Sequence, residues 1–538
     1  MTVRQASAPI TDKEIDSAAI QGGEKRIKEL FASSNKDGPY TYMDAKCRLY
    51  PKLSFFFDGT NNNLERDLPL NRHSNIAKLF RAAVNDRQRL GSSPRYIPGV
   101  GTPFQFPKVA GYTDKLEDDP GGVRGLGLGA GGDVRIKFAL AEFSRILERD
   151  WGAAAWKCMQ FINVAIFGFS RGATEARAFV RRLIDTKSER TDGGLIWFAP
   201  NGERVPLRIN FMGLFDTVAS VGGPALHLDW ASELAIPPEV ERCVHYVSAH
   251  EVRQAFPLDS LRVGRTYAAN CEEVVYPGVH SDVGGGYAPD EQGRRNDLAC
   301  IPLRHMLADA VRAGVPMQLP RQIDPKYRVD YVLSDDAPIT NLYQTYISAL
   351  PEASGDDLES LIHAHRRLNF RWRGMLARQR TDLRVLGQLY GKVSAAVCAS
   401  VPPATDQDHP PCAPSTWVYD IPAQPEAQAK QLLAEQRRLV QQIAFLRNPV
   451  ESRRADRDWP PPPPRPLTDY EKLILSSWDD SSAMPSAVDS LLAEYVHDSV
   501  AAFISWPCAL HDPRGVYCDG KKYYAHSQDV DSNAASIA

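Results

Sequence analysis

The stretch that decides the fold reads FINVAIFGFSRG and covers residues 161–172. Its first seven residues are almost all apolar and rich in β-branched side chains, which is typical of a parallel strand buried on both faces. The stretch ends in the pentapeptide GFSRG, and the pattern that follows predicts a helix over residues 173–183. A strand, a tight turn centred on a serine and a helix form a nucleophile elbow, so Ser170 is the candidate nucleophile.

The context of this Gly-x-Ser-x-Gly pattern gives it weight, because a chain with 37 glycines can contain the pattern by chance. Gly168 and Gly172 meet a steric need of the elbow. The serine there has a strained backbone, and its neighbours must leave room for the turn and for the substrate. The amide of Arg171, at the start of the predicted helix, is a candidate hydrogen-bond donor to an oxyanion.

Three further apolar stretches predict strands, at residues 53–57, 208–215 and 272–279. Helices are predicted over residues 76–84 and 133–149. Buried strands that alternate with helices favour a doubly wound α/β sheet. We therefore expect an α/β-hydrolase fold, with a mostly parallel central sheet flanked by helices and with a largely helical insertion or second domain.

Two polar residues follow predicted strands directly and fit the partners of a nucleophilic serine. Asp216 ends the strand at 208–215, and His280 follows the strand at 272–279. A serine hydroxyl needs a base, and the base needs an acid that orients it. In this fold they follow in the order serine, acid, histidine, at the carboxyl ends of strands. Asp216 is therefore the candidate acid and His280 the candidate base.

Other histidines and carboxylates leave one alternative open. His497, beside Asp498, is a second candidate base, although it lies within a predicted helix far along the chain. Asp282 is too close to His280 in sequence to orient its ring easily, and Asp58 is expected to shape its own loop. Structural roles are favoured for His245 and His250, and His363 and His365 belong to a predicted basic helix.

The loop after the first predicted strand is expected to supply a second oxyanion donor, since α/β hydrolases take one from a loop after an early strand. Gly59 and Thr60 offer the best amides, and a plain turn is the alternative. Residues 127–132 match Gly-x-Gly-x-x-Gly, but no buried strand precedes them, so a dinucleotide site is not expected. The sequence has no HExxH, Cys/His quartet or EF-hand pattern, and we predict neither a metal nor a cofactor.

The length of 538 residues exceeds the usual size of one hydrophobic core. We predict an N-terminal extension (1–50), an α/β-hydrolase catalytic domain (51–300), a helical region of membrane or lid type with a proline-rich connector (301–490), and a C-terminal segment that packs back on the hydrolase domain (491–538). The net charge of −3 indicates no nucleic-acid partner. Nine scattered cysteines predict reduced thiols, and the first residues lack the apolar core of a signal peptide.

The predicted helix at 357–380 interleaves apolar residues with arginines and has two interpretations. It could meet an anionic lipid surface, with Trp372 at the interface. Alternatively, its apolar face packs on the domain and its arginines are solvated. Further helices are predicted at 426–447 and 486–504, and five prolines at 460–464 predict an extended connector.

Six motifs occur in a characteristic order, with YVHDS (495–499) as a weaker addition. They are FDGTNN (57–62), HSNI (73–76), PGVGT (98–102), GFSRGA (168–173), GLFDTV (213–218) and PGVHSDVGG (277–285). Together they resemble the Tle1-like catalytic domain, found in the first family of lipase effectors of the bacterial type VI secretion system. The resemblance covers about residues 50–300, and no motif transfers to residues 301–490.

The resemblance implies a phospholipase A that cleaves acyl esters of glycerophospholipids with the triad Ser170, Asp216 and His280. It also implies synthesis in the bacterial cytoplasm without a signal peptide and delivery through a spike protein of the secretion system. The expected site of action is the membrane or periplasm of a target cell, and a cognate immunity protein is expected to neutralise the enzyme. Two rival functions remain open: a soluble esterase for other esters, and a non-catalytic scaffold with a hydrolase-like fold.

Overall fold

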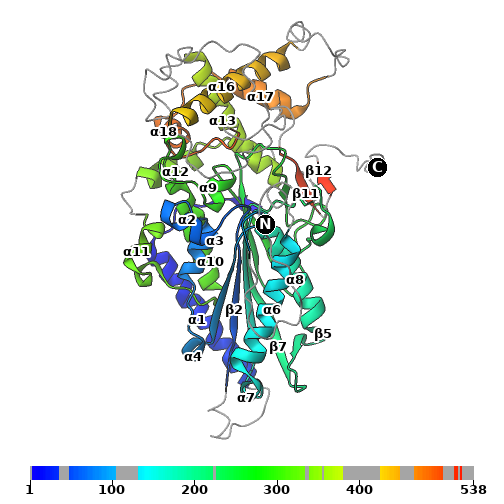
Figure 1. The fold of residues 1–538 in the computed structure, drawn as a ribbon. Coiled ribbons are helices and arrows are strands. Elements are labelled where there is room, and N and C mark those ends of the chain that lie inside the picture. The colour runs from blue at the N-terminus through cyan, green and yellow to red at the C-terminus, as the bar shows by residue number, and fades with distance from the viewer. Residues whose placement is uncertain are drawn as a thin grey trace.

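The computed structural model describes most of the chain, and everything below concerns the described residues (Figure 1). They are residues 3–34, 48–104, 131–221, 226–333, 338–353, 355, 357–379, 425–448, 466–500, 514–518 and 521–523. The proline run at 460–464 and most of the glycine-rich stretch at 121–132 lie outside these ranges.

A nine-stranded sheet forms the centre of the molecule, and seven of its strands run parallel in the order β1-β10-β8-β7-β4-β2-β3. These strands are β1 (Val3–Gln5), β2 (Lys52–Phe57), β3 (Ser92–Ile97), β4 (Ile162–Phe169), β7 (Arg204–Phe215), β8 (Cys243–Ser248) and β10 (Cys271–Tyr276). The strands β5 (Glu189–Thr191) and β6 (Gly194–Phe198) add an antiparallel hairpin beside β7. The predicted α/β fold with a mostly parallel sheet is confirmed.

Helices cover both faces of the sheet because its strands are apolar on both sides. On β2, Phe56 packs into one core, and its neighbours Phe55 and Phe57 pack into the other. The first core lies under α1 (Asp12–Ser34), α3 (Asn75–Ala82) and α10 (Cys300–Arg312); the second lies under α6 (Gly132–Arg145) and α8 (Arg171–Lys187) (Figure 1). A π-helical turn (Ile146–Trp151) extends α6.

A helical layer lies over one end of the sheet, which is also the end that carries α9 (His280–Gly284) (Figure 1). The layer comprises α12 (Pro338–Ser348), α13 (Leu358–Gln379), α16 (Pro425–Arg447), α17 (Asp469–Asp479) and α18 (Ser486–Glu494). A small sheet of β9 (Leu258–Asp259), β11 (Val516–Cys518) and β12 (Lys521–Tyr523) lies beside it. The remaining short helices are α2 (Leu64–Asp67), α4 (Arg87–Leu90), α7 (Ala153–Trp156) and α11 (Pro325–Arg328).

Described segments near both ends of the chain are built into the fold. Residues 3–5, in the predicted N-terminal extension, form an edge strand of the central sheet next to β10. In the C-terminal segment, β11 pairs with β9. The predicted helix at 486–504 is too long, because α18 ends at Glu494. Residues 495–500 are not helical, and His497, Asp498 and Ser499 bond to distant parts of the chain.

The arginine-rich helix α13 packs against the rest of the protein. Trp372 is buried and donates from Nε1 to Asp489 (2.7 Å), so it is not available to a membrane interface. Arg373 is also buried and forms an ion pair with Asp498 (2.7 Å). Arg378 donates to the main-chain carbonyl of Asp480 (2.7 Å). The packing interpretation of this helix holds, but Arg373 is buried instead of solvated, and the exposed Arg378 also bonds within the protein.

One cysteine departs from the expectation of reduced thiols. Cys158 is disulfide-bonded, so that expectation is wrong at this residue. Free, buried thiols occur at Cys243, Cys271, Cys300 and Cys518. Among the helices of the described part of the chain, none combines the length and the apolar character that crossing a bilayer requires.

Candidate active site

Ser170 lies at the turn between β4 and α8, in a backbone conformation that non-glycine residues rarely adopt. Its φ is 57° and its ψ is −128°. The glycines around it are required by close contacts. A Cβ atom on Gly168 would lie 2.5 Å from Cα of Ala173, and one on Gly172 would lie 2.2 Å from the carbonyl oxygen of Asp58. The local geometry is therefore that of the predicted nucleophile elbow.

Backbone hydrogen bonds hold this elbow against the end of β7, where Asp216 lies. The amide of Ser170 donates to the carbonyl of Phe215 (3.0 Å), and the amide of Val218 donates to the carbonyl of Ser170 (3.3 Å). Asp216 itself has a positive φ of 39°. Two strained residues on adjacent strands thus lie side by side at the carboxyl edge of the sheet.

Asp216 is completely buried and has three partner residues. Its carboxylate accepts hydrogen bonds from Nδ1 of His280 (2.6 Å) and from the amide and hydroxyl of Ser248 (both 2.9 Å). Nη2 of Arg514 lies 2.9 Å from the same carboxylate. Burial by itself would raise the pKa of Asp216, but Arg514, His280 and the Ser248 amide outweigh it and hold this pKa well below its ordinary value.

His280 is the first residue of α9, and its ring contacts two aromatic rings from other parts of the chain. Its ring centroid lies 4.6 Å from that of Phe169 and 5.2 Å from that of Phe256. Its amide donates to the buried carboxylate of Glu251 (3.3 Å). Burial lowers the pKa of His280, although the bond to Asp216 opposes this effect. The imidazole is therefore neutral at pH 7, which is the state that a general base needs.

The structure brings the three predicted residues into one site but does not join all of them by hydrogen bonds. Nδ1 of His280 is bound to Asp216, which leaves Nε2 for the serine. Ser170 Oγ has no hydrogen-bond partner within the described ranges. Catalytic hydrogen bonds often tighten only when substrate binds, so the absence of this bond does not argue against proton transfer from Ser170 to His280.

The predicted oxyanion donors separate into two groups. The amide of Gly59 donates to the Asp58 carboxylate (2.7 Å), so as it stands it does not serve an oxyanion. Arg171 begins α8, where the first amides of a helix are directed beyond its N-terminus. Its guanidinium donates to the hydroxyl of Thr60 (2.7 Å), which ties the elbow to the 58–60 loop.

Asp58 organises its own loop, as the sequence predicted. Besides the Gly59 amide, its carboxylate accepts hydrogen bonds from the hydroxyls of Ser74 and Tyr96 (both 2.5 Å). Burial raises the pKa of Asp58 to about 6, although these hydrogen bonds oppose the shift. Asp58 is not bonded to His280 and does not compete with Asp216 for it.

His497, the alternative base, binds a different carboxylate. Its Nδ1 lies 2.6 Å from Asp282, and its amide donates to the other oxygen of that side chain (3.1 Å). The ring of Tyr287 stacks on it with a centroid distance of 3.8 Å. The two candidate bases therefore belong to separate Asp–His pairs: Asp216 binds His280, and Asp282 binds His497.

Several residues of the site were not predicted from the sequence. Ser248 ends strand β8 at the same sheet edge as Asp216, so its position could have indicated it. Glu251 lies in the loop that follows. Arg514 had no signal, because it lies almost three hundred residues beyond Asp216 and outside any motif. Within the described ranges, no group of three or more His, Cys, Asp or Glu side chains is arranged to hold a metal ion.

The parallel sheet and the elbow at its carboxyl edge define an α/β hydrolase. Residues 52–187 and 197–309 match the family model of the catalytic domain of Tle1-like phospholipase effectors of the type VI secretion system. These residues therefore form a Tle1-like catalytic domain, which confirms the resemblance of the motifs. The match supports the role of a phospholipase effector of that secretion system.

A solved structure shows the same fold. The chain is similar to an uncharacterized protein from Pseudomonas aeruginosa, with 22% identity and a TM-score of 0.63; the match covers 97% of this chain and 85% of the other. A structure of the Tle1 effector bound to the VgrG spike of the type VI secretion system matches with 19% identity and a TM-score of 0.37, over 59% of this chain and 84% of the other. No curated protein sequence matches the chain.

Proposed function

We propose that the protein is a serine phospholipase of the A type, with Ser170 as the nucleophile, His280 as the base and Asp216 as the acid. The observation that carries this proposal is the junction of a strained elbow serine with a buried Asp–His pair at one sheet edge. The match of residues 52–187 and 197–309 to the family model supports a lipid ester as the substrate.

The proposed reaction begins when Nε2 of His280 takes the proton of Ser170 Oγ, which attacks the carbonyl carbon of an acyl ester. Asp216 stabilises the resulting imidazolium through Nδ1. The intermediate collapses, the C–O bond to glycerol breaks, and the leaving oxygen takes the proton from His280. Water, deprotonated by His280, then cleaves the acyl-enzyme and releases a fatty acid. Ser170 recovers its proton from His280.

The oxyanion formed in both steps needs donors that are in place beforehand. We assign this role to the amides of Arg171 and Thr60, which belong to two loops joined by the bond between the Arg171 guanidinium and the Thr60 hydroxyl. Gly59 takes no part, because its amide binds Asp58.

The biological setting is proposed from the family. The type VI secretion system would deliver the enzyme on a spike protein, and glycerophospholipids of a target cell would be its substrate. A cognate immunity protein would protect the producing cell. Co-purification of the chain with a spike protein of its own secretion system would test the delivery step.

The proposal is tested with defined phospholipids that carry different acyl chains at sn-1 and sn-2, and with mass spectrometry of the products. Ser170→Ala should lower turnover by on the order of 10⁴ or more without unfolding the protein. Ser281→Ala, which removes a hydroxyl next to His280, is the matched control and should retain activity. A fluorophosphonate should label wild type and Ser281→Ala but not Ser170→Ala. If Ser170→Ala keeps more than about a tenth of wild-type turnover, Ser170 is not the nucleophile.

A further inference from the structure

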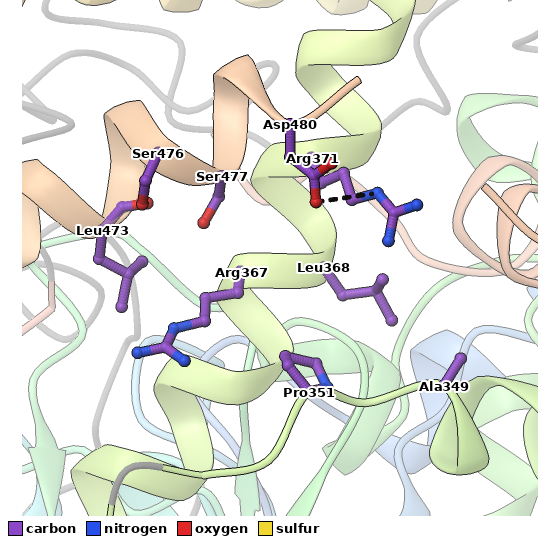
Figure 2. Close-up of a pocket in the computed structure, with 9 residues that line it drawn as sticks. All are labelled: Ala349, Pro351, Arg367, Leu368, Arg371, Leu473, Ser476, Ser477 and Asp480. Carbon is purple, nitrogen blue, oxygen red and sulfur yellow. Dashed lines mark hydrogen bonds and ion pairs between the residues drawn. The ribbon is translucent and has the colours of Figure 1, made fainter. Parts of the chain in front are cut away.

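A pocket of about 290 Å³ lies between α13 and α17, in the helical layer over the carboxyl edge of the sheet (Figures 1 and 2). Two arginines of α13, Arg367 and Arg371, line one side of it, and Ser476, Ser477 and Asp480 line the other. Its volume lies at the lower end of the range for small-molecule sites. It suits a head group better than a whole lipid.

Arg367 is the arginine of α13 that the structure leaves for a ligand. Arg371 points away from it, towards Asp480 (3.4 Å), and also donates to two main-chain carbonyls (Figure 2). Arg366 donates to main-chain carbonyls of the hydrolase fold. Within the described ranges, by contrast, Arg367 makes no hydrogen bond, ion pair or ring contact. A guanidinium at a pocket without a partner favours a phosphate or carboxylate.

A serine on the opposite wall strengthens this assignment. Ser477 is 9% exposed as a whole residue and lines the pocket, and its hydroxyl makes no hydrogen bond to the described residues. The hydroxyl of its neighbour Ser476 is instead used within α17, where it donates to the carbonyl of Leu473 (3.1 Å). Two guanidinium groups and one carboxylate give the pocket a net positive charge, which selects an anion.

The helix that carries Arg367 contacts the candidate active site through Glu251. Arg366, the residue before Arg367, donates to the carbonyl of Glu251 (2.9 Å), and the carboxylate of Glu251 accepts from the amide of His280 (3.3 Å). Successive residues of a helix lie about 100° apart on a cylinder roughly 10 Å across. The pocket and the contact to the His280 loop therefore occupy adjacent faces of one helical turn.

We propose that this pocket binds the phosphate of a phosphate ester, namely the head group of a phospholipid whose acyl ester is presented to Ser170. This inference rests on the proposed function. Arg367 would bind the phosphate in a bidentate manner, Ser477 would donate a hydrogen bond to it, and Leu368 and Leu473 would contact the adjoining carbon atoms.

Binding is measured in the full-length Ser170→Ala protein by co-sedimentation, so that turnover does not consume the vesicles. One set of vesicles is made of phosphatidylglycerol and the other of a phosphate-free galactolipid. We expect Arg367→Gln to weaken binding to phosphatidylglycerol about tenfold, the effect of one charge-assisted contact. Arg265→Gln, which removes an exposed arginine with no partner among the described residues, should change it less than twofold. Neither change should affect the galactolipid.

A second pair of variants tests the opposite wall. Ser477→Ala should weaken phosphatidylglycerol binding several-fold, whereas Ser476→Ala should not. The proposal is wrong if Arg367→Gln behaves like Arg265→Gln, or if both vesicle types respond equally. The proposal is also wrong if the protein binds soluble glycerol phosphate saturably but does not bind the vesicles, because the phosphate ester is then not that of a membrane lipid. Failure of wild type to hydrolyse phospholipid would refute the proposed function and would leave this binding result intact.

Discussion

Replacing Arg514 with glutamine tests how the candidate acid is held. Arg514 is buried, lies 2.9 Å from the carboxylate of Asp216 and donates to the hydroxyl of Ser248 (2.8 Å). Removing one partner of a buried ion pair costs about 3–5 kcal/mol, because the other charge stays buried without compensation. Asp216 keeps three hydrogen bonds, so we expect the lower end, about 3 kcal/mol of lost unfolding free energy.

The same substitution should change the pH dependence of catalysis. Without the guanidinium, the pKa of Asp216 rises, and its negative charge acts more fully on His280. The pKa of His280 then rises as well, so the acid limb of kcat/KM moves to higher pH. The pKa of Asp216 is lower in the folded than in the unfolded protein, so the ionised side chain stabilises the fold at pH values above the unfolded pKa. This stabilisation is lost as the pH falls through the folded pKa. Arg514→Gln should therefore unfold at a higher pH on acidification than wild type.

Urea denaturation gives the unfolding free energy, and kcat/KM for a short soluble ester between pH 4 and 8 gives the profile. Arg514→Lys keeps the charge and should restore most of the wild-type profile. Arg304→Gln removes another buried arginine, which binds main-chain carbonyls and Asp12. It should lower stability without moving the profile. A variant Arg514→Gln with unchanged stability and an unchanged acid limb would refute the reasoning.

Three further results follow from the same geometry. Burial lowers the pKa of His280, so kcat/KM should fall only when pH drops below the ordinary histidine pKa of about 6.5, as steady-state kinetics can show. Gly172→Ala should cost about 1–3 kcal/mol in thermal unfolding, because its Cβ would lie 2.2 Å from the carbonyl oxygen of Asp58. His497→Gln breaks the buried bond to Asp282 and should lower stability by about 1–3 kcal/mol. Its turnover should stay far above that of His280→Ala; equal losses would make His497 the base.

The sequence predicted those parts of the site that depend on local patterns. The elbow follows from an apolar run and two glycines, and Asp216 and His280 follow from their places after strands. In a parallel sheet these strand ends meet at one edge, so their convergence can be inferred without coordinates. Which hydrogen-bonding groups are already occupied by a side chain cannot be inferred in this way. Gly59 has the right type and position for an oxyanion donor, yet its amide is used by Asp58, which only the three-dimensional structure reveals.

The end of the chain could not be predicted for a related reason. Apolar residues at 486–504 fit a helix, but α18 ends at Glu494 because the next residues bind distant groups. His497 binds Asp282, and Ser499 donates to Glu251 (3.0 Å). Buried charges without partners are costly, so these tertiary bonds outweigh the helical pattern. The prediction failed where the C-terminal segment meets the loops of the site.

Arg514 changes the electrostatic account of the proposed triad. With Asp216 ionised, Arg514 charged and His280 neutral, the three groups together carry no net charge before the reaction. When His280 takes the proton of Ser170, the group becomes positive while a negative oxyanion forms beside α8. The only new charges are therefore those of the imidazolium and the oxyanion. In a buried site, partners that are already in place stabilise such charges strongly. Because Arg514 also holds part of the Asp216 charge, His280 is a weaker base than it would be with Asp216 alone. This effect adds to burial, which lowers the pKa of His280 and keeps the imidazole neutral and ready to accept a proton at pH 7.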